Sequence, residues 1–409
     1  MRVLFVTPYY KPAHLGGIER AIEKLAAALG RQQGITELGV LTTPYAFPPR
    51  YVHGLPPRET LPEGLRVYRL RPTPRTPLPL FPYYSCPVTL FRPAELRAVL
   101  AHFQPDVVHL VGDGWVWPHL WLLGQRAAAT AVVFTPSFHD LRGSRAWLAL
   151  PNRVVCRAAE RTTVLTEHER RGVTAAYHPS PARLVTVPWG VDLPPRAEAG
   201  PVRPPQGAVT VLCVGRLGQH KGQAWLLDLY GRARPAFQRL ARLVFVGKDE
   251  GDSGGRAALV RRIAAAGLED EVVLAGEVDD AALARYYASA DLFALFSRYE
   301  AFGLVYCEAM AHGVPVLTHR VGANAEVLAQ GAVLTAPYAA AEAAAALVAL
   351  VNDAPERARL GAQARAFVEN TYSWEAVAAR YRRVYEEAID ERRRPPRPAP
   401  RRGPAHPDR

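Results

Sequence analysis

Short apolar runs alternate with amphipathic helical patterns along most of this chain. The first run, RVLFVT at 2–7, predicts a buried strand, and 18–29 has the spacing of apolar positions typical of a helix. A loop that ends in Gly16 and Gly17 separates them. The same order of strand, glycine-bounded loop and helix returns at 209–232. Alternating strands and helices predict doubly wound parallel sheets, so the expected fold class is α/β.

The chain divides where its composition changes. A length of 409 residues predicts two domains, and the Pro/Gly-rich stretch at 188–207 is the expected boundary between them. We therefore predict an N-terminal domain at 1–190, a second domain at 191–372 and a last amphipathic helix at 373–391. The remaining tail, 392–409, consists mainly of Arg and Pro and is expected to be disordered, because it has no apolar residues to bury.

The segment SRYEAFGLVYCEAMAHGVPVLT, at 297–318, carries two carboxylates around an expected helix start near Gly303. Glu308 lies about one turn into that helix, leans toward its N-terminus and can accept hydrogen bonds from ribose hydroxyls. Glu300 lies in the approach loop and can meet a group beyond the phosphates. On spacing alone, a solvated Glu300 and a loop-capping Glu308 are equally good interpretations. The first amides of a helix have no intrahelical partner, so three can receive a phosphate here: those of Gly303, Leu304 and Val305.

Two cations follow another strand end of the same domain. Arg216 and Lys221 lie in the glycine-bounded loop GRLGQHKG. Because ligands of parallel sheets bind beyond the carboxyl ends of the strands, these cations and the helix start at Gly303 together predict a diphosphate site. The chain contains no Asp-x-Asp pair, so we expect no metal ion at this site. The Gly16-Gly17 loop and the turn at 136–140 would face the site across an interdomain cleft.

The composition, 49% hydrophobic and 22% charged, is that of a globular protein with a sizeable core. No apolar run approaches the roughly 20 residues that span a bilayer, and the four cysteines, which lack metal or redox spacing, predict reduced thiols in the cytoplasm. The formal net charge is +12, of which the tail, with seven Arg and one Asp, supplies +6. Such a tail can attract anionic lipid at the inner membrane face. A nucleic-acid partner is not expected, since no recognition helix or aromatic platform accompanies the charge.

The segment from Glu300 to Val316 resembles the Glu-x7-Glu signature of glycosyltransferase family 4. The match covers nearly the whole chain apart from 44–93 and the tail. It implies a GT-B fold, in which two Rossmann-like domains face each other across a cleft and a C-terminal helix crosses back to the first domain. Further segments resemble that family in the expected order: Gly16-Gly17-Ile-Glu-Arg20, Val187-Pro-Trp-Gly-Val-Asp192, Val214-Gly-Arg-Leu217 with Lys221-Gly222, and Ser373-Trp374-Glu375.

The resemblance implies a retaining transfer of a hexosyl group from a nucleotide-diphosphate sugar, which is a co-substrate and not a cofactor. Arg216 and Lys221 would neutralise charge on the leaving diphosphate. Glu308 would hold the ribose of the nucleotide. Glu300 would contact hydroxyls of the donor sugar, close to three backbone amides, those of Phe302, Gly303 and Leu304.

The resemblance also implies roles for the first domain. Gly16, beside Gly17, would approach the distal phosphate when the domains close, and His139 would lie near the transferred sugar. The leaving phosphate is expected to assist deprotonation of the acceptor by front-face attack, so no separate protein base is required. The acceptor is expected to be a sugar, a lipid-linked group or a small molecule of glycan, glycolipid or cell-envelope biosynthesis.

Two positions depart from the family pattern. Many members carry His-x-His after the strand at 106–111, but here Val111 stands at the second position, which weakens any role for His109. The usual Val-Gly-Gly-x-x-Glu reads Val-Gly-Ala-Asn-Ala-Glu, with Ala323 in place of a glycine. The identity of the sugar therefore stays open, and a catalytically idle nucleotide-sugar-binding or scaffold protein remains the alternative.

Overall fold

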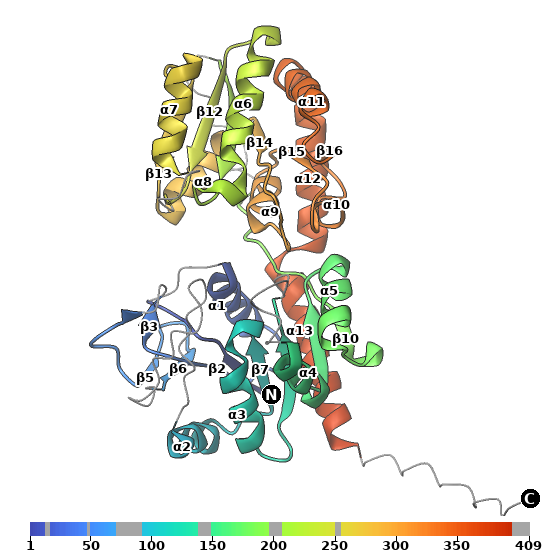
Figure 1. The fold of residues 1–409 in the computed structure, drawn as a ribbon. Coiled ribbons are helices and arrows are strands. Elements are labelled where there is room, and N and C mark those ends of the chain that lie inside the picture. The colour runs from blue at the N-terminus through green and yellow to red at the C-terminus, as the bar shows by residue number, and fades with distance from the viewer. Residues whose placement is uncertain are drawn as a thin grey trace, which may run out of the picture.

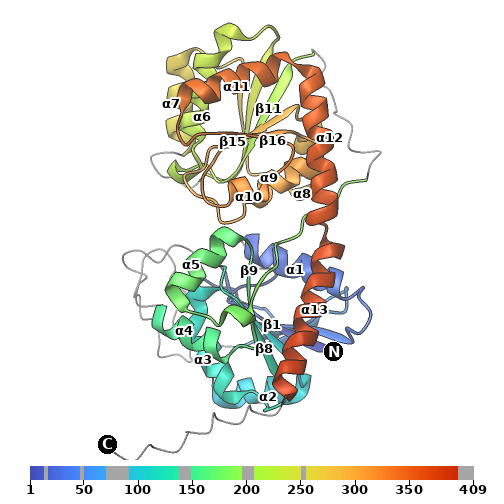
Figure 2. The ribbon, with the colours of Figure 1, turned by 90° about the vertical axis from the view of Figure 1, so that its right-hand side faces the viewer.

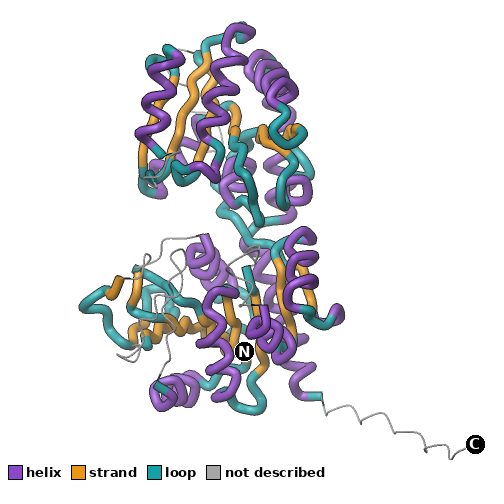
Figure 3. The backbone as a smooth tube through the Cα atoms, viewed as in Figure 1, coloured by secondary structure: helices purple, strands orange, loops and turns teal. Residues whose placement is uncertain are grey.

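The computed structural model describes residues 1–12, 17–46, 50–70, 92–137, 149–195, 207–249 and 255–394. Two parallel sheets, each flanked by helices, form an upper and a lower domain (Figure 1). Strands lie inside and helices outside in both (Figure 3). The two sheets confirm the predicted α/β class. Among the described helices, none combines the length and apolarity that a bilayer crossing requires.

The first domain is built on an eight-stranded sheet with the order β10-β9-β8-β7-β1-β2-β6-β5. All neighbours pair in parallel except β5 and β6, which are antiparallel. Its strands are β1 (Arg2–Val6), β2 (Glu37–Thr42), β5 (Arg58–Thr60), β6 (Arg66–Arg69), β7 (Val107–Val111), β8 (Ala131–Thr135), β9 (Arg161–Val164) and β10 (Leu184–Thr186), beside a small hairpin of β3 (Tyr45–Ala46) and β4 (Arg50–Tyr51). Its helices are α1 (Gly17–Leu29), α2 (Pro93–Phe103), α3 (Val116–Gln125), α4 (Ala149–Ala158) and α5 (Glu167–Tyr177).

The second domain is built on a six-stranded parallel sheet with the order β13-β12-β11-β14-β15-β16. The order turns back between β11 and β14, and such a switch point leaves a crevice at the carboxyl ends of the strands. Its strands are β11 (Val209–Val214), β12 (Ala241–Val246), β13 (Val272–Gly276), β14 (Leu292–Ala294), β15 (Val316–His319) and β16 (Ala332–Thr335). Its helices are α6 (Gln223–Ala233), α7 (Arg256–Ala266), α8 (Asp280–Ser289), α9 (Leu304–Ala311), α10 (Asn324–Val327), α11 (Ala340–Asn352) and α12 (Ala354–Thr371).

The last helix, α13 (Trp374–Arg393), leaves the second domain after α12 and packs on the first (Figure 2). Its buried face, which includes Tyr381 and Tyr385, covers the first-domain sheet. Where the chain crosses back, the amide of Val191 donates to the carbonyl of Tyr372 at 2.8 Å. At the neighbouring Gly190 a Cβ would lie only 2.5 Å from the ring of Trp374. The two crossing segments are therefore fastened to each other.

The expected end of the last helix at residue 391 was wrong by two residues. Helix α13 continues to Arg393, because Arg392 is fixed at the first-domain surface. Its guanidinium donates to the carbonyl of Ala128 at 2.7 Å and to Glu160 at 3.3 Å. Residues 395–409 lie outside the described part of the chain.

Candidate active site

The loops that follow β11, β12 and β14 pack backbone against backbone. Gly222 has a φ of +71°, and a Cβ there would lie 2.1 Å from the carbonyl oxygen of Phe296. At Gly247 a Cβ would lie 2.1 Å from the carbonyl oxygen of Gly215. Only glycine permits such close approach, so these loops are held together at the carboxyl end of the sheet. Arg216 and Lys221 lie on the first of them.

The structure brings together two of the predicted site residues, Lys221 and Glu300. The ammonium of Lys221 lies 2.7 Å from Oε1 of Glu300, and the hydroxyl of Ser297 donates to the same oxygen at 2.7 Å. Glu300 is only 8% exposed, so solvent screens this pair less than it would a surface pair. The interpretation of Glu300 as a solvated carboxylate is therefore wrong.

The backbone of Glu300 is fixed by the turn that precedes α10. The amide of Ala323 donates to the carbonyl of Glu300 at 3.0 Å. Gly322 has a φ of +53°, and a Cβ there would lie 2.2 Å from that carbonyl oxygen. Ala323 itself has a φ of −90° and a ψ of 0°, a conformation found in type I turns that does not require glycine, so the turn accommodates the alanine at this position.

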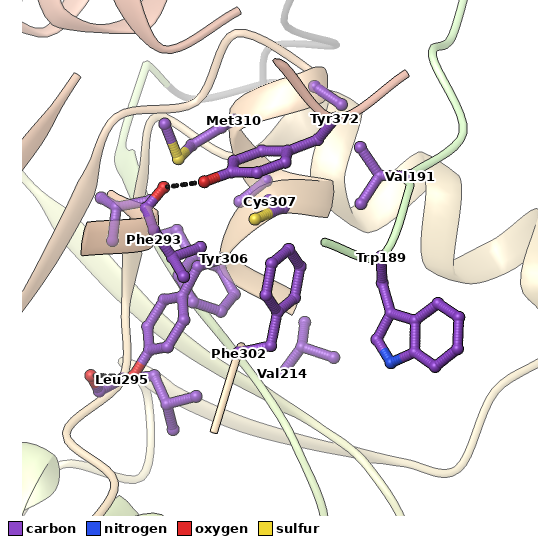
Figure 4. Packing of buried hydrophobic residues seen from close by; sticks show 14 of the residues in the cluster. Trp189, Val191, Val214, Phe293, Leu295, Phe302, Tyr306, Cys307, Met310 and Tyr372 are labelled. Atoms are coloured by element: carbon purple, nitrogen blue, oxygen red, sulfur yellow. Dashed lines mark hydrogen bonds between the residues drawn. The ribbon is translucent and has the colours of Figure 1, made fainter. Parts of the chain in front are cut away.

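Helix α9 begins where the sequence predicted. Gly303 precedes its first residue with a left-handed φ of +79°, and a Cβ there would lie 2.5 Å from the ring of Tyr306. The amides of Leu304 and Val305 belong to the first turn, where phosphate groups bind to helices. Phe302 is buried edge-on against Tyr372, with ring centroids 5.4 Å apart (Figure 4). Phe302 therefore offers a ligand its backbone and not its ring.

Glu308 lies on α9 and is hydrogen-bonded to the second-domain helix α8. The hydroxyl of Tyr287 donates to its Oε2 at 2.7 Å. The Tyr287 ring also stacks on His312, with centroids 5.3 Å apart. Burial raises the pKa of the Glu308 carboxyl, while the bond from Tyr287 and the positive charge of Arg20 act in the opposite direction. Glu308 is therefore held by a tyrosine, which argues against the interpretation that it caps a loop.

Tyr287 and Ser297 were missed at the sequence level. Ser297 lies three residues before Glu300, a spacing that could have suggested a shared turn. Tyr287 shows the pattern of a core aromatic residue on a helix, and no sequence signal connects it with Glu308. The side-chain amide of Gln223 donates to the carbonyl of Arg216 at 2.9 Å, which fixes the backbone of that predicted phosphate ligand.

Only some of the residues predicted for the first-domain side of the site lie in the described part of the chain. Gly16 and His139 lie outside the described residues, and Gly17 is the first residue of α1. His109 is fully buried, and its ring nitrogens lie 2.8 Å from the hydroxyl of Tyr385 and 2.7 Å from that of Thr135. Burial lowers the pKa of His109 to about 3. This histidine therefore joins β7, β8 and α13 as a neutral structural residue.

The side chains described at this site do not form a group of metal ligands. Within the described ranges, no group of three or more His, Cys, Asp or Glu side chains is arranged to hold an ion. Glu300 is occupied by Lys221, and Glu308 by Tyr287. What the arrangement offers instead is cations, helix amides and two carboxylates around one strand-end crevice.

Comparisons with known proteins agree with this geometry. The family model described as "Glycosyl transferase 4-like domain" matches residues 16–190, and that described as "Glycosyl transferases group 1" matches 197–367. A D-inositol 3-phosphate glycosyltransferase of Kineococcus radiotolerans is 30% identical over 92% of each chain. A GDP-mannose:cellobiosyl-diphosphopolyprenol alpha-mannosyltransferase of Komagataeibacter xylinus is 25% identical over 95% of this chain and 94% of its own.

Solved structures show the same fold. Sucrose-phosphate synthase from Thermosynechococcus elongatus superposes with a TM-score of 0.75 at 21% identity, covering 95% of this chain and 99% of its own. The HepE protein of Anabaena, solved with UDP and glucose, gives 0.70 at 16% identity over 94% and 99%. These likenesses confirm the expected GT-B architecture, and the sequence relatives confirm the family. The chain therefore belongs to the GT-B glycosyltransferases of the family 4 type.

Proposed function

We propose that this glycosyltransferase moves a hexosyl group from a nucleotide-diphosphate sugar to an acceptor hydroxyl, with retention at the anomeric carbon and without a metal ion. The observation that carries the proposal is the buried pair of Lys221 and Glu300 beside the first turn of α9. In one crevice, helix amides can bind the phosphates of a sugar diphosphate and the carboxylate can accept hydrogen bonds from the sugar hydroxyls. The cation can neutralise the charge that develops on the leaving diphosphate.

The ion pair suggests how the donor is received. A diphosphate would draw the Lys221 ammonium away from Glu300, because it carries more negative charge than one carboxylate. Glu300 would then accept hydrogen bonds from sugar hydroxyls in place of Lys221. The bond from the anomeric carbon to the phosphate oxygen breaks, and the acceptor oxygen attacks from the same face. The acceptor proton passes to the leaving phosphate, so the charges balance without a protein base.

The acceptor is proposed from the relatives alone. Their names describe an inositol phosphate in one case and a diphosphopolyprenol-linked sugar in the other. A small phosphorylated polyol and a lipid-linked glycan are therefore the two acceptor classes to test. For the lipid-linked class we propose a cytoplasmic enzyme in peripheral contact with the anionic inner membrane face, to which the basic tail contributes.

The test begins with thermal shifts against a panel of nucleotide-diphosphate sugars, followed by transfer assays with the donor that binds. A ligand at about 100 times its dissociation constant adds about 2.7 kcal/mol of stability, which such a screen detects. Glu300→Gln should lower turnover at least about a hundredfold while the sugar-free nucleotide diphosphate still binds. Lys221→Ala should lower turnover and also weaken binding of the nucleotide diphosphate. Glu269→Gln, at an exposed position of the same domain, is the control. Saturable donor binding without transfer or donor hydrolysis would reject the proposal in favour of an idle binding protein.

A further inference from the structure

One carboxylate of the second domain is seated on a helix of the first. Glu326, on α10, accepts hydrogen bonds from the amide of Glu167 at 2.7 Å and from the amide of His168 at 3.1 Å. These are the first two residues of α5, whose amides have no partner within the helix. Both oxygens of Glu326 are used, and its negative charge lies at the positive end of the helix dipole. We call Glu326 and these two amides the α5 clasp.

The first two amides of helix α5 are available for bonds to the second domain. The third is already bonded within the first domain. Thr166 precedes the helix in extended conformation, and its hydroxyl accepts from the amide of Glu169 at 3.0 Å. The carboxylate of Glu169 in turn accepts from the amide of Leu165. This reciprocal capping orders the helix start locally. The clasp is therefore an interdomain contact that bonds the two amides left over by the local cap of α5.

Helix α10, which carries Glu326, is hydrogen-bonded to the turn that fixes the backbone of Glu300. The amide of Glu326 donates to the carbonyl of Ala323, and the amide of Ala323 donates to the carbonyl of Glu300, both at 3.0 Å. A second contact joins the same regions, because the ring of Tyr299 lies 5.9 Å from the ring of His168. Three successive hydrogen bonds thus connect α5 of the first domain with the backbone of Glu300: α5 to Glu326, Glu326 to Ala323 and Ala323 to Glu300.

Two other ion pairs between the domains do not lead to Glu300. Arg20 pairs with Asp280 at 3.0 Å and Lys24 with Asp192 at 2.6 Å, and both pairs involve α1. Figure 2 shows α1 and α5 at separate positions beneath the second domain. Neither Asp280 nor Asp192 belongs to the loop of Glu300, and both are largely exposed, so these pairs add little specific positioning.

We propose that Glu326 is a positioning residue, which uses the α5 clasp to set Glu300 against the donor sugar when the two domains come together. This inference rests on the proposed function of Glu300. The clasp acts on the placement of Glu300, whereas the residues proposed to hold the nucleotide diphosphate are Arg216, Lys221 and Glu308. Its loss should therefore lower kcat and leave nucleotide affinity unchanged.

The experiment removes the clasp from each side. Glu326→Ala should lower kcat about tenfold and Glu326→Gln about threefold, while the dissociation constant of the nucleotide diphosphate stays within about twofold. Glu167→Pro removes one donor amide from the other side. Proline is well tolerated at the first position of a helix, and the extended Thr166 before it is compatible with proline. Glu167→Ala is the matched control, because it keeps the amide while losing the same side chain.

Two further readouts separate the outcomes. The charge of the clasp is exposed to solvent, so 1 M NaCl should shrink the kcat ratio of wild type to Glu326→Ala. Hydrogen exchange at the first turn of α5 should be faster in Glu326→Ala than in the wild type. Wild-type kcat and wild-type exchange in Glu326→Ala would overturn the inference, whether or not Glu167→Pro folds. Failure of the wild type itself to transfer sugar would instead reject the proposed function, and the exchange rates would still report on the clasp.

Discussion

The two domains share one architecture but hold their neighbouring elements together in different ways. In the second domain, glycines at 222, 247 and 322 let backbone lie directly on backbone around the strand-end crevice. In the first domain, side chains do this work: His109 of β7 is bonded to Thr135 of β8 and to Tyr385 of α13. A backbone contact depends on one residue type at one position. A side-chain network depends on several partners far apart in the sequence.

This difference explains why the proposed donor site could be predicted from local motifs while the contacts of the first domain could not. Glycine at a left-handed position leaves a trace in the sequence, and the surrounding charges indicate which kind of ligand to propose for the loop. His109 and Tyr385 are 276 residues apart, and nothing near either residue indicates the other. We expect substitutions in the two domains to fail in correspondingly different ways, and three predictions test this.

The largest effect is expected when a backbone contact of the second domain is broken. Gly322→Ala would place a Cβ 2.2 Å from the carbonyl oxygen of Glu300, so that the loop of this proposed donor-sugar ligand must move. We expect turnover to fall at least about a hundredfold, as for loss of a catalytic electrostatic contact. Gly267→Ala is the matched control, because its φ of +61° imposes similar strain while its Cβ would meet no described atom within 4 Å. Equal losses of activity in the two variants would show that strain, and not the contact, matters.

The second prediction concerns the stability of the first domain at acid pH. His109 has a pKa lowered to about 3 in the folded state, whereas the unfolded chain takes up a proton near the usual value of about 6.5. The free energy of unfolding should therefore fall as the pH drops from about 6.5 toward 3, by up to about 1.4 kcal/mol per pH unit from this group. His109→Gln should reduce that slope in urea unfolding at several pH values. His178→Asn, at an exposed position, should leave it unchanged.

The smallest effect is expected at Tyr287, where a side-chain contact supports the donor site. Burial raises the pKa of Glu308, so binding of the nucleotide should weaken as the pH falls through that raised value. The bond from Tyr287 favours the ionised carboxylate, so Tyr287→Phe should move the acid limb of donor binding to higher pH and raise KM a few-fold with little change in kcat.

Binding isotherms across pH, with Tyr286→Phe as the neighbouring control, check this prediction. The other charges near Glu308 are those of Arg20, Asp192 and Asp280, and both variants leave them in place. An unshifted acid limb in Tyr287→Phe would mean that burial and these charges, and not the tyrosine, set the ionisation of Glu308.

Sequence patterns predicted the strands, the helices and the donor loops well, because alternating burial and glycine positions are local properties. The start of α9 at Gly303 followed from one apolar run and one glycine. The partners of the carboxylates did not follow, since Tyr287 resembles any core tyrosine and Lys221 is 79 residues from Glu300. The end of α13 was misjudged for the same reason: Arg392 is ordered by Glu160, which no local pattern reveals.

The return of α13 to the first domain bears on how the protein is made. Residues 1–187 leave the ribosome before the second domain, yet the helix that covers their sheet emerges after it. Until Tyr385 arrives, the ring of His109 lacks one of its two hydrogen-bond partners and the sheet lacks part of its cover. The second domain, contiguous in sequence, can complete its core while the chain is still attached. Of these two domains, the one translated earlier is thus finished later, and a chain cut short before α13 would present part of an apolar sheet to the cell's chaperones and proteases.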